Sequence, residues 1–117
     1  MEAVQKQLQE TIASYKTNQK DMTRLTSQRQ QLDAQLSENK IVLEELQLLE
    51  PGAEVFKMIG PVLVRQDLDE SRMNVEKRID YISKELKRHE DSITVLEQKQ
   101  NDLKVGFDGF FFLLSLD

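Results

Sequence analysis

Few side chains in this sequence have the types and spacing that catalysis or metal binding requires. The 117 residues include one histidine, His89, and no cysteine, so histidines and thiolates cannot complete a metal site. The many carboxylates lie next to basic residues at helical spacing, as Asp80 does to Lys84. That arrangement is typical of solvated ion pairs and not of a general acid and base in a pocket. We therefore expect no catalytic residues, no metal and no cofactor.

The glycines and the charges exclude two further kinds of ligand site. Gly60 precedes Pro61 inside an apolar segment and does not open a helix, so it is not placed to cradle a phosphate. The net charge is -5 and both signs are dispersed: residues 1–50 carry six basic and eight acidic groups, and residues 67–105 carry eight and ten. Without a basic patch, we expect no nucleic acid partner.

Nothing in the sequence predicts a membrane protein. The apolar run Phe110–Leu114 is far too short to span a bilayer, and no basic and apolar leader opens the chain. The absence of cysteine suits a reducing compartment. We expect a soluble protein with no membrane contact and a cytoplasmic location.

Two long stretches carry the heptad pattern of a coiled coil. In alternating steps of four and three from Val4 to Leu46, nine of thirteen positions are apolar, and the same steps from Leu68 to Leu103 give eight of eleven. A pattern sustained over five or more heptads predicts one long helix in each half. The fold class expected is mainly α, a long antiparallel two-helix coiled coil joined by one β-hairpin.

The ends of the two helices have recognisable signals. Pro51 cannot continue a helical hydrogen-bond ladder, and Gly52 provides a left-handed exit. Asp67 with Glu70 three residues later has the spacing of a capping box, which predicts the start of the second helix. We divide the chain into a first helix, a hairpin, a second helix and an atypical apolar tail, at residues 1–50, 51–66, 67–105 and 106–117.

The segment between the helices predicts a β-hairpin for assembly. Two β-branched, apolar runs flank Gly60 and Pro61, and both faces of the resulting hairpin are apolar. Because an isolated two-stranded hairpin is marginally stable, we expect it to pair with hairpins of other chains. The alternative is that it folds onto its own helices. The assembly residues expected are Val55, Phe56, Met58, Ile59, Gly60, Pro61, Val62, Leu63 and Val64.

Several segments of the hairpin and its flanking helices have a specific sequence. They are Glu38–Leu46, Val55–Leu68, Arg78–Ile82 and Glu85–Arg88. The most specific part is the Gly-Pro-Val-Leu-Val stretch that lies between two heptad helices. With these segments the chain resembles the β-class subunits of prefoldin, and the resemblance covers residue 1 to about Leu103.

The resemblance implies a hetero-hexamer of two α-class and four β-class subunits, whose hairpins join into a β-barrel platform with coiled coils as tentacles. It implies a co-chaperone that holds non-native polypeptides such as actin and tubulin without ATP and delivers them to the cytosolic chaperonin. One hairpin per chain is the mark of the β class. From the residues alone, a structural coiled-coil scaffold or tether without holdase activity stays open as the alternative.

The tail departs from the resemblance. The heptad steps continue through Phe107 to Leu114, although Gly106 and Gly109 each cost a helix about 1 kcal/mol relative to alanine. Next to these heptad positions lies a cluster of apolar tail residues. We expect this cluster and the first apolar residues of the first helix to bind client polypeptides. The alternative is a tail that folds back on the first helix or is disordered. The client-binding residues expected are Met1, Val4, Leu8, Phe111, Phe112, Leu113 and Leu116.

The helix ends also predict how the two stripes face each other. Facing residues should have numbers that sum to about 118, which pairs Leu32 with Leu86, whereas a slip by one heptad would give 111 and pair Leu32 with Ile79. The first register sets Asn18 against Gln100. Polar residues in such a seam fix the register at a cost in stability, or else they lie in loose, solvated positions.

Overall fold

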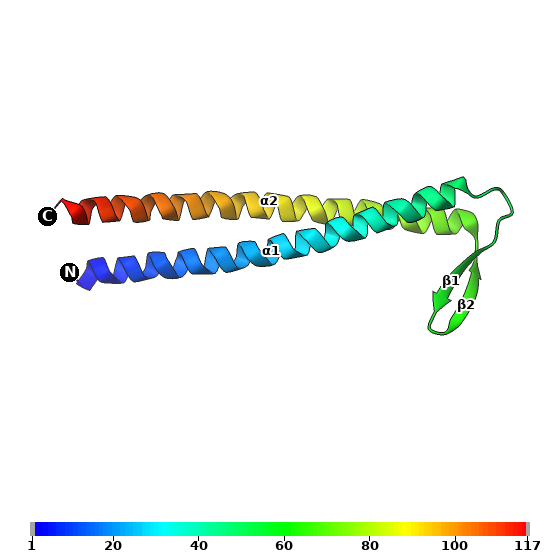
Figure 1. Cartoon of the computed structure of the whole chain (residues 1–117), viewed down its shortest axis with the longest axis horizontal. Coiled ribbons are helices and arrows are strands. Elements are labelled where there is room, and N and C mark those ends of the chain that lie inside the picture. Colours follow the sequence, from blue (N-terminus) through cyan, green and yellow to red (C-terminus); the bar gives the residue numbers. More distant parts are fainter. Residues whose placement is uncertain (1, 117) are drawn as a thin grey trace. The chain divides into compact units, whose positions relative to one another are not determined.

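The computed structural model describes residues 2–116. Its elements are, in chain order, α1 (Glu2–Leu48), β1 (Val55–Ile59), β2 (Val62–Gln66) and α2 (Leu68–Ser115), so the hairpin connects the two helices (Figure 1). This confirms the expected fold class. The residues form two compact units, which we name the hairpin unit, residues 30–87, and the terminal unit, residues 2–29 with residues 88–116.

The first helix ends where the sequence predicts. α1 stops at Leu48, shortly before Pro51, which cannot donate to the helical ladder. Gly52 has a φ of 91°, a left-handed conformation that glycine adopts without a Cβ clash. The N–H of Ala53 then donates to the carbonyl of Glu50 at 3.1 Å and closes the turn toward β1.

The second helix begins at the expected cap. The backbone N–H of Glu70 donates to Oδ2 of Asp67 at 3.0 Å, which satisfies one of the free donors at the start of α2. The N–H of Ser71 donates to the carbonyl of Asp67 at 2.9 Å and begins the helical ladder.

α2 does not end at residue 105, where we expected the tail to begin. It continues through Gly106 and Gly109, so the tail is helical as far as Ser115. Phe107 and Phe110 are half-buried on the seam side of this last part, which offsets the unfavourable helix propensity of the two glycines.

Apart from Ser71, the buried residues lie on the two predicted stripes. Within the hairpin unit these stripe residues are aliphatic, whereas the terminal unit adds one polar residue at the seam. This is the apolar stripe expected of paired helices. The buried stripe residues are Leu46, Val75, Ile82 and Leu86 in the hairpin unit, and Asn18 and Ile93 in the terminal unit.

Hydrogen bonds between the helices favour the register that we predicted. The numbers of the bonded residues sum to between 114 and 121, so they centre near 118 and not on the slipped value of 111. Such bonds join Asn18 to Leu96, Tyr15 to Gln100, Gln28 to His89, Arg72 to Leu46 and Arg72 to Leu49.

Asn18 and Gln100, which we predicted to face each other, form hydrogen bonds to other residues. Nδ2 of Asn18 donates to the carbonyl of Leu96 at 2.9 Å, and Nε2 of Gln100 donates to the hydroxyl oxygen of Tyr15 at 3.0 Å. Each side chain thus reaches diagonally across the seam to a residue of the adjacent layer. The expectation that Asn18 and Gln100 face each other places them in the right part of the seam but does not give their hydrogen bonds.

Candidate subunit interface

A tight turn sets the geometry of the hairpin. β1 and β2 pair antiparallel, and the innermost pair is Ile59 with Val62, which leaves Gly60 and Pro61 as a two-residue loop. Gly60 has a φ of 59°, and the ring of Pro61 holds the φ of that residue at about -65°. A positive φ at the first loop position only is the pattern of a type II′ turn, whose twist matches the flanking strands.

The pairing register assigns each side chain to a face. Residues directly opposite each other share a face, and successive residues of one strand alternate. The two faces therefore both carry large apolar groups. One face holds Val55, Lys57, Ile59, Val62, Val64 and Gln66, and the other holds Phe56, Met58, Leu63 and Arg65.

Most of this apolar surface is open to solvent. Six of the expected assembly residues are 40–70% exposed, while Val55 is half-buried. The chain therefore does not cover its own hairpin, contrary to the alternative in which the hairpin folds onto the helices. The six exposed residues are Phe56, Met58, Ile59, Val62, Leu63 and Val64.

A groove separates β1 from the helices of the hairpin unit. It has a volume of about 320 Å³, and apolar side chains from α1, β1 and α2 line it. Lys57 and Arg78 also line the groove, so it has a basic component. The apolar lining includes Val42, Leu46, Phe56, Met58 and Val75.

Arg72 joins the end of α1 to the start of α2. Its Nε and Nη2 donate to the carbonyl of Leu46 at 3.1 and 2.8 Å, and Nη2 also donates to the carbonyl of Leu49 at 3.2 Å. The last carbonyls of a helix lack partners within it, and α1 has no basic residue in its last turn. Arg72 therefore supplies the missing cap from the other helix, and its Nη1 lies 3.6 Å from Asp69.

The sequence reasoning missed this role. Arg72 interrupts the apolar stripe of the second helix, and we considered such polar seam residues only as register determinants or as loose positions. The available signal was its position four residues after Leu68, which places Arg72 on the stripe near the start of the second helix, while the sum of 118 sets it opposite Leu46 at the end of the first. A guanidinium with several donors at that place is suited to free carbonyls.

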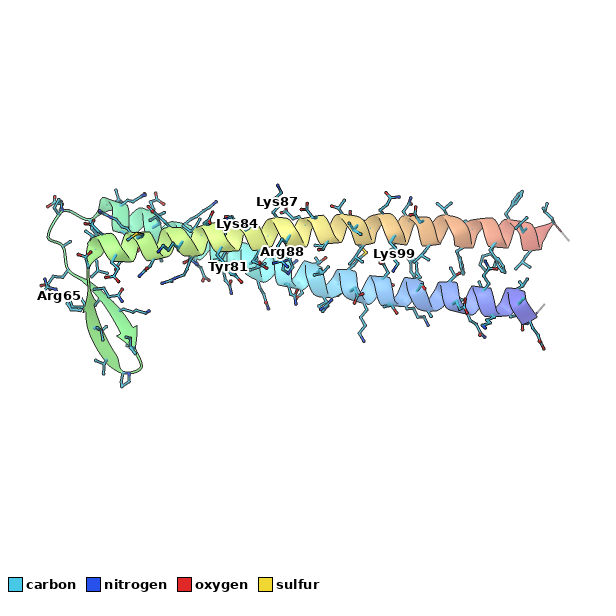
Figure 2. All side chains as sticks on the ribbon, turned by 180° about the vertical axis from the view of Figure 1, so that it is seen from behind. Arg65, Tyr81, Lys84, Lys87, Arg88 and Lys99 are labelled. Atoms are coloured by element: carbon cyan, nitrogen blue, oxygen red, sulfur yellow. The ribbon has the colours of Figure 1, made fainter. Side chains whose placement is uncertain are left out.

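Weaker contacts fix the base of the hairpin. The hydroxyl of the buried Ser71 donates to Oε1 of Gln66 at 3.3 Å, which ties the end of β2 to the first turn of α2. Arg65 lies 3.6 Å from Glu54, and Figure 2 shows Arg65 at the base of the hairpin. Both partners are well exposed, and ion pairs of this kind contribute little stability.

The terminal unit holds the second predicted group of residues. Met1 lies outside the described residues, and Val4 and Leu8 are half-buried on the seam of α1. The tail residues of the group are 50–66% exposed along the last turns of α2. The structure thus presents an apolar surface at the C-terminal end of α2, consisting of Phe111, Phe112, Leu113 and Leu116.

The seam becomes more open toward the end of α2. The rings of Phe107 and Phe111 meet edge to face with centroids 4.7 Å apart. Leu114, which the heptad pattern placed on the seam opposite Val4, is 46% exposed. The apolar surface of the tail therefore includes a predicted seam position.

Two further features concern ligand and membrane sites. Within residues 2–116, no three histidine, aspartate or glutamate side chains come together in a way that could hold a metal ion. Over the same residues, neither helix has an apolar stretch long enough to cross a membrane.

The prefoldin subunit family matches residues 9–108, most of the chain. The chain belongs to the prefoldin subunit family. This prefoldin subunit is 51% identical to prefoldin subunit 6 of Bos taurus over 98 residues, which is 84% of this chain and 76% of the bovine protein. The same comparison with prefoldin subunit 6 of Homo sapiens gives 50% identity and the same coverage.

Solved structures support the fold of this prefoldin subunit. The crystal structure of the prefoldin beta subunit from Thermococcus strain KS-1 superposes with a TM-score of 0.82, covering 88% of this chain and 90% of that one at 22% identity. At that identity the likeness concerns the fold alone. The family match, the identity to prefoldin subunit 6 and this fold with its single hairpin together confirm the resemblance that we drew from the sequence. The family match ends at residue 108, so the exposed apolar residues of the tail lie beyond it.

Proposed function

We propose that this chain acts as one β-class subunit of a hetero-hexameric prefoldin, which binds non-native polypeptides such as actin and tubulin in the cytoplasm without ATP and delivers them to the cytosolic chaperonin. The observation that supports this proposal most directly is the exposure of six apolar side chains on both faces of the hairpin. The membership of this chain in the prefoldin subunit family supports the same function.

The exposed hairpin requires partner chains. A contiguous apolar surface of this kind is rare on a soluble monomer, and the outer edges of a two-stranded sheet leave backbone groups unpaired. Hairpins of other prefoldin subunits, two of the α class and further ones of the β class, would cover both the faces and the edges. The residues proposed for assembly are those of the hairpin from Val55 to Val64.

Client holding needs only weak, repeated apolar contacts. Several subunits that each present an apolar end raise the effective concentration of binding sites around one non-native chain, so no nucleotide is needed. In this subunit we propose that the contacts come from both helices of the terminal unit. The residues proposed are Met1, Val4, Leu8, Phe111, Phe112, Leu113 and Leu116.

Assembly is tested by placing charge on the hairpin. The double variant Val62→Lys and Val64→Lys puts two ammonium groups on one face, and we expect it to be lost from the complex when it is co-expressed with the partner subunits. A matched control, Val95→Lys with Val105→Lys, changes two exposed valines of α2 outside the hairpin and should assemble normally. Native mass spectrometry gives the subunit count, and co-assembly of the hairpin variant would contradict the proposal.

Holdase activity is tested on the assembled complex. Unfolded actin is diluted into buffer without nucleotide, and light scattering reports its aggregation. We expect suppression at stoichiometric amounts of complex and transfer of the held actin when the chaperonin is added. Assembly without suppression would favour the alternative function, a structural scaffold or tether, and strict dependence on ATP would contradict the mechanism.

A further inference from the structure

A cavity lies between the helices of the terminal unit, one to two turns from the exposed apolar end of α2. Its volume is about 400 Å³, within the usual range for sites that bind small ligands. Most of its lining is apolar, and two aromatic rings contribute, one from each helix. The lining residues are Thr11, Ile12, Tyr15, Lys16, Gln19, Leu103 and Phe107.

Contacts outside the cavity hold its walls in place. The hydroxyl of Tyr15 accepts a hydrogen bond from Nε2 of Gln100 at 3.0 Å, and the ring of Phe107 packs edge to face on Phe111 at 4.7 Å. The hydroxyl of Thr11 donates to a carbonyl of its own helix at 2.9 Å. The polar groups of Tyr15 and Thr11 are therefore already engaged, and their apolar parts remain to contact a ligand.

Lys16 gives the lining of the cavity a positive charge. It is the one charged residue of the lining, and its side chain is exposed. Among residues 2–116, no carboxylate pairs with its ammonium group within ion-pair distance. An apolar ligand that carries a negative charge next to its buried group would gain an attraction that a neutral or basic ligand lacks.

We propose that this cavity binds one aromatic side chain of a non-native polypeptide, with preference for a segment in which acidic residues flank the aromatic one. The inference rests on the proposed function and specifies which segments of a client this subunit holds. Aromatic side chains bury about 150–250 Å² each and dominate the energetics of interfaces, so an aromatic residue gains the most from an apolar cavity. The flanking carboxylate meets Lys16 at the cavity mouth, where salt weakens the attraction.

The test measures the binding of two unstructured ten-residue peptides to the assembled complex by fluorescence anisotropy. Each peptide has one tryptophan, flanked by glutamates in one and by lysines in the other. We expect the acidic peptide to bind about three- to tenfold more tightly at low salt, a range set by the weak energies of exposed ion pairs. Lys16→Glu should remove or reverse this preference. The matched control Lys6→Glu makes the same charge change at an exposed position outside the cavity lining and should keep the preference.

Two further variants test the cavity itself. Ile12→Glu places a charge in the partly exposed lining, and Gln19→Trp fills the cavity from an exposed position without removing a side-chain hydrogen bond. Both should weaken the acidic peptide at least tenfold. Circular dichroism reports whether the helices stay intact, and Gln19→Trp provides the test if Ile12→Glu lowers helicity.

Each result decides between specific alternatives. Unchanged peptide affinity in Gln19→Trp would show that the cavity is not the site, and an unchanged charge preference in Lys16→Glu would overturn the role of Lys16. A complex that suppresses aggregation of unfolded actin but binds neither peptide would refute this inference and leave the proposed function standing. A complex that does neither would refute both.

Discussion

Replacing Asn18 with leucine should stabilise the terminal unit. Asn18 is 2% exposed, and its carboxamide is only half satisfied. Nδ2 donates to the carbonyl of Leu96 at 2.9 Å and approaches Sδ of Met22 at 3.7 Å. Oδ1 has no hydrogen-bond partner among the described residues. Leucine has nearly the same size and would remove this unsatisfied oxygen from the seam.

The expected gain follows from the groups that change. A buried acceptor without a partner costs about 1–3 kcal/mol, and the hydrogen bond that Asn18 gives up contributes about 1 kcal/mol. The carbonyl of Leu96 lies inside α2, whose own ladder continues to satisfy it. The added apolar burial favours leucine further. We therefore expect a net gain of about 1–2 kcal/mol, a factor of roughly 5–30 in the opening equilibrium.

Native-state hydrogen exchange measures this gain locally. In the assembled complex, the amides of the terminal unit should exchange roughly 5–30 times more slowly in Asn18→Leu than in the parent protein. Asn39→Leu is the matched control, because Asn39 is half-buried in the hairpin unit and its Nδ2 donates to the carbonyl of Gln35 in its own helix at 2.7 Å. The control should leave the terminal unit unchanged. Faster exchange in Asn18→Leu would refute the reasoning, because the hydrogen bond to Leu96 would then outweigh the unsatisfied oxygen.

Two further predictions concern Arg72 and the glycines. Arg72→Met should lower the free energy of unfolding of the hairpin unit by about 1.5–3 kcal/mol, measured in urea, because the end of α1 loses its charged donors. Arg72→Lys should recover only part of the lost stability. Equal stability of the parent and both variants would contradict the capping role. Alanine should have opposite effects at two glycines where, among residues 2–116, no atom lies within 4 Å of an added Cβ. Gly60→Ala should destabilise the hairpin by about 1–2 kcal/mol because of its positive φ and should weaken assembly, while Gly109→Ala should stabilise α2 by about 1 kcal/mol. Stronger assembly of Gly60→Ala, or a lower thermal midpoint of Gly109→Ala, would count against this explanation.

The sequence by itself determined the elements and the apolar faces of the hairpin, because their causes are local. Heptad spacing produces two amphipathic helices in any context that lets their stripes meet. Pro51 and Gly52 end α1 through restrictions on their own backbone, and the carboxylate of Asp67 caps α2 through a bond that spans three residues. The hairpin likewise follows from two β-branched, apolar runs on either side of a Gly-Pro turn, which only a few backbone conformations allow.

Only the tertiary structure decided what the polar seam residues do. Asn18, Arg72 and Gln100 look alike in the sequence as interruptions of a stripe, yet the first is buried with an unpaired oxygen, the second caps the other helix and the third fixes a tyrosine beside a cavity. These outcomes depend on the axial shift and rotation of one helix against the other to within a few ångströms. Heptad periodicity defines which side of each helix faces its partner, but a side chain one turn along the seam meets different atoms.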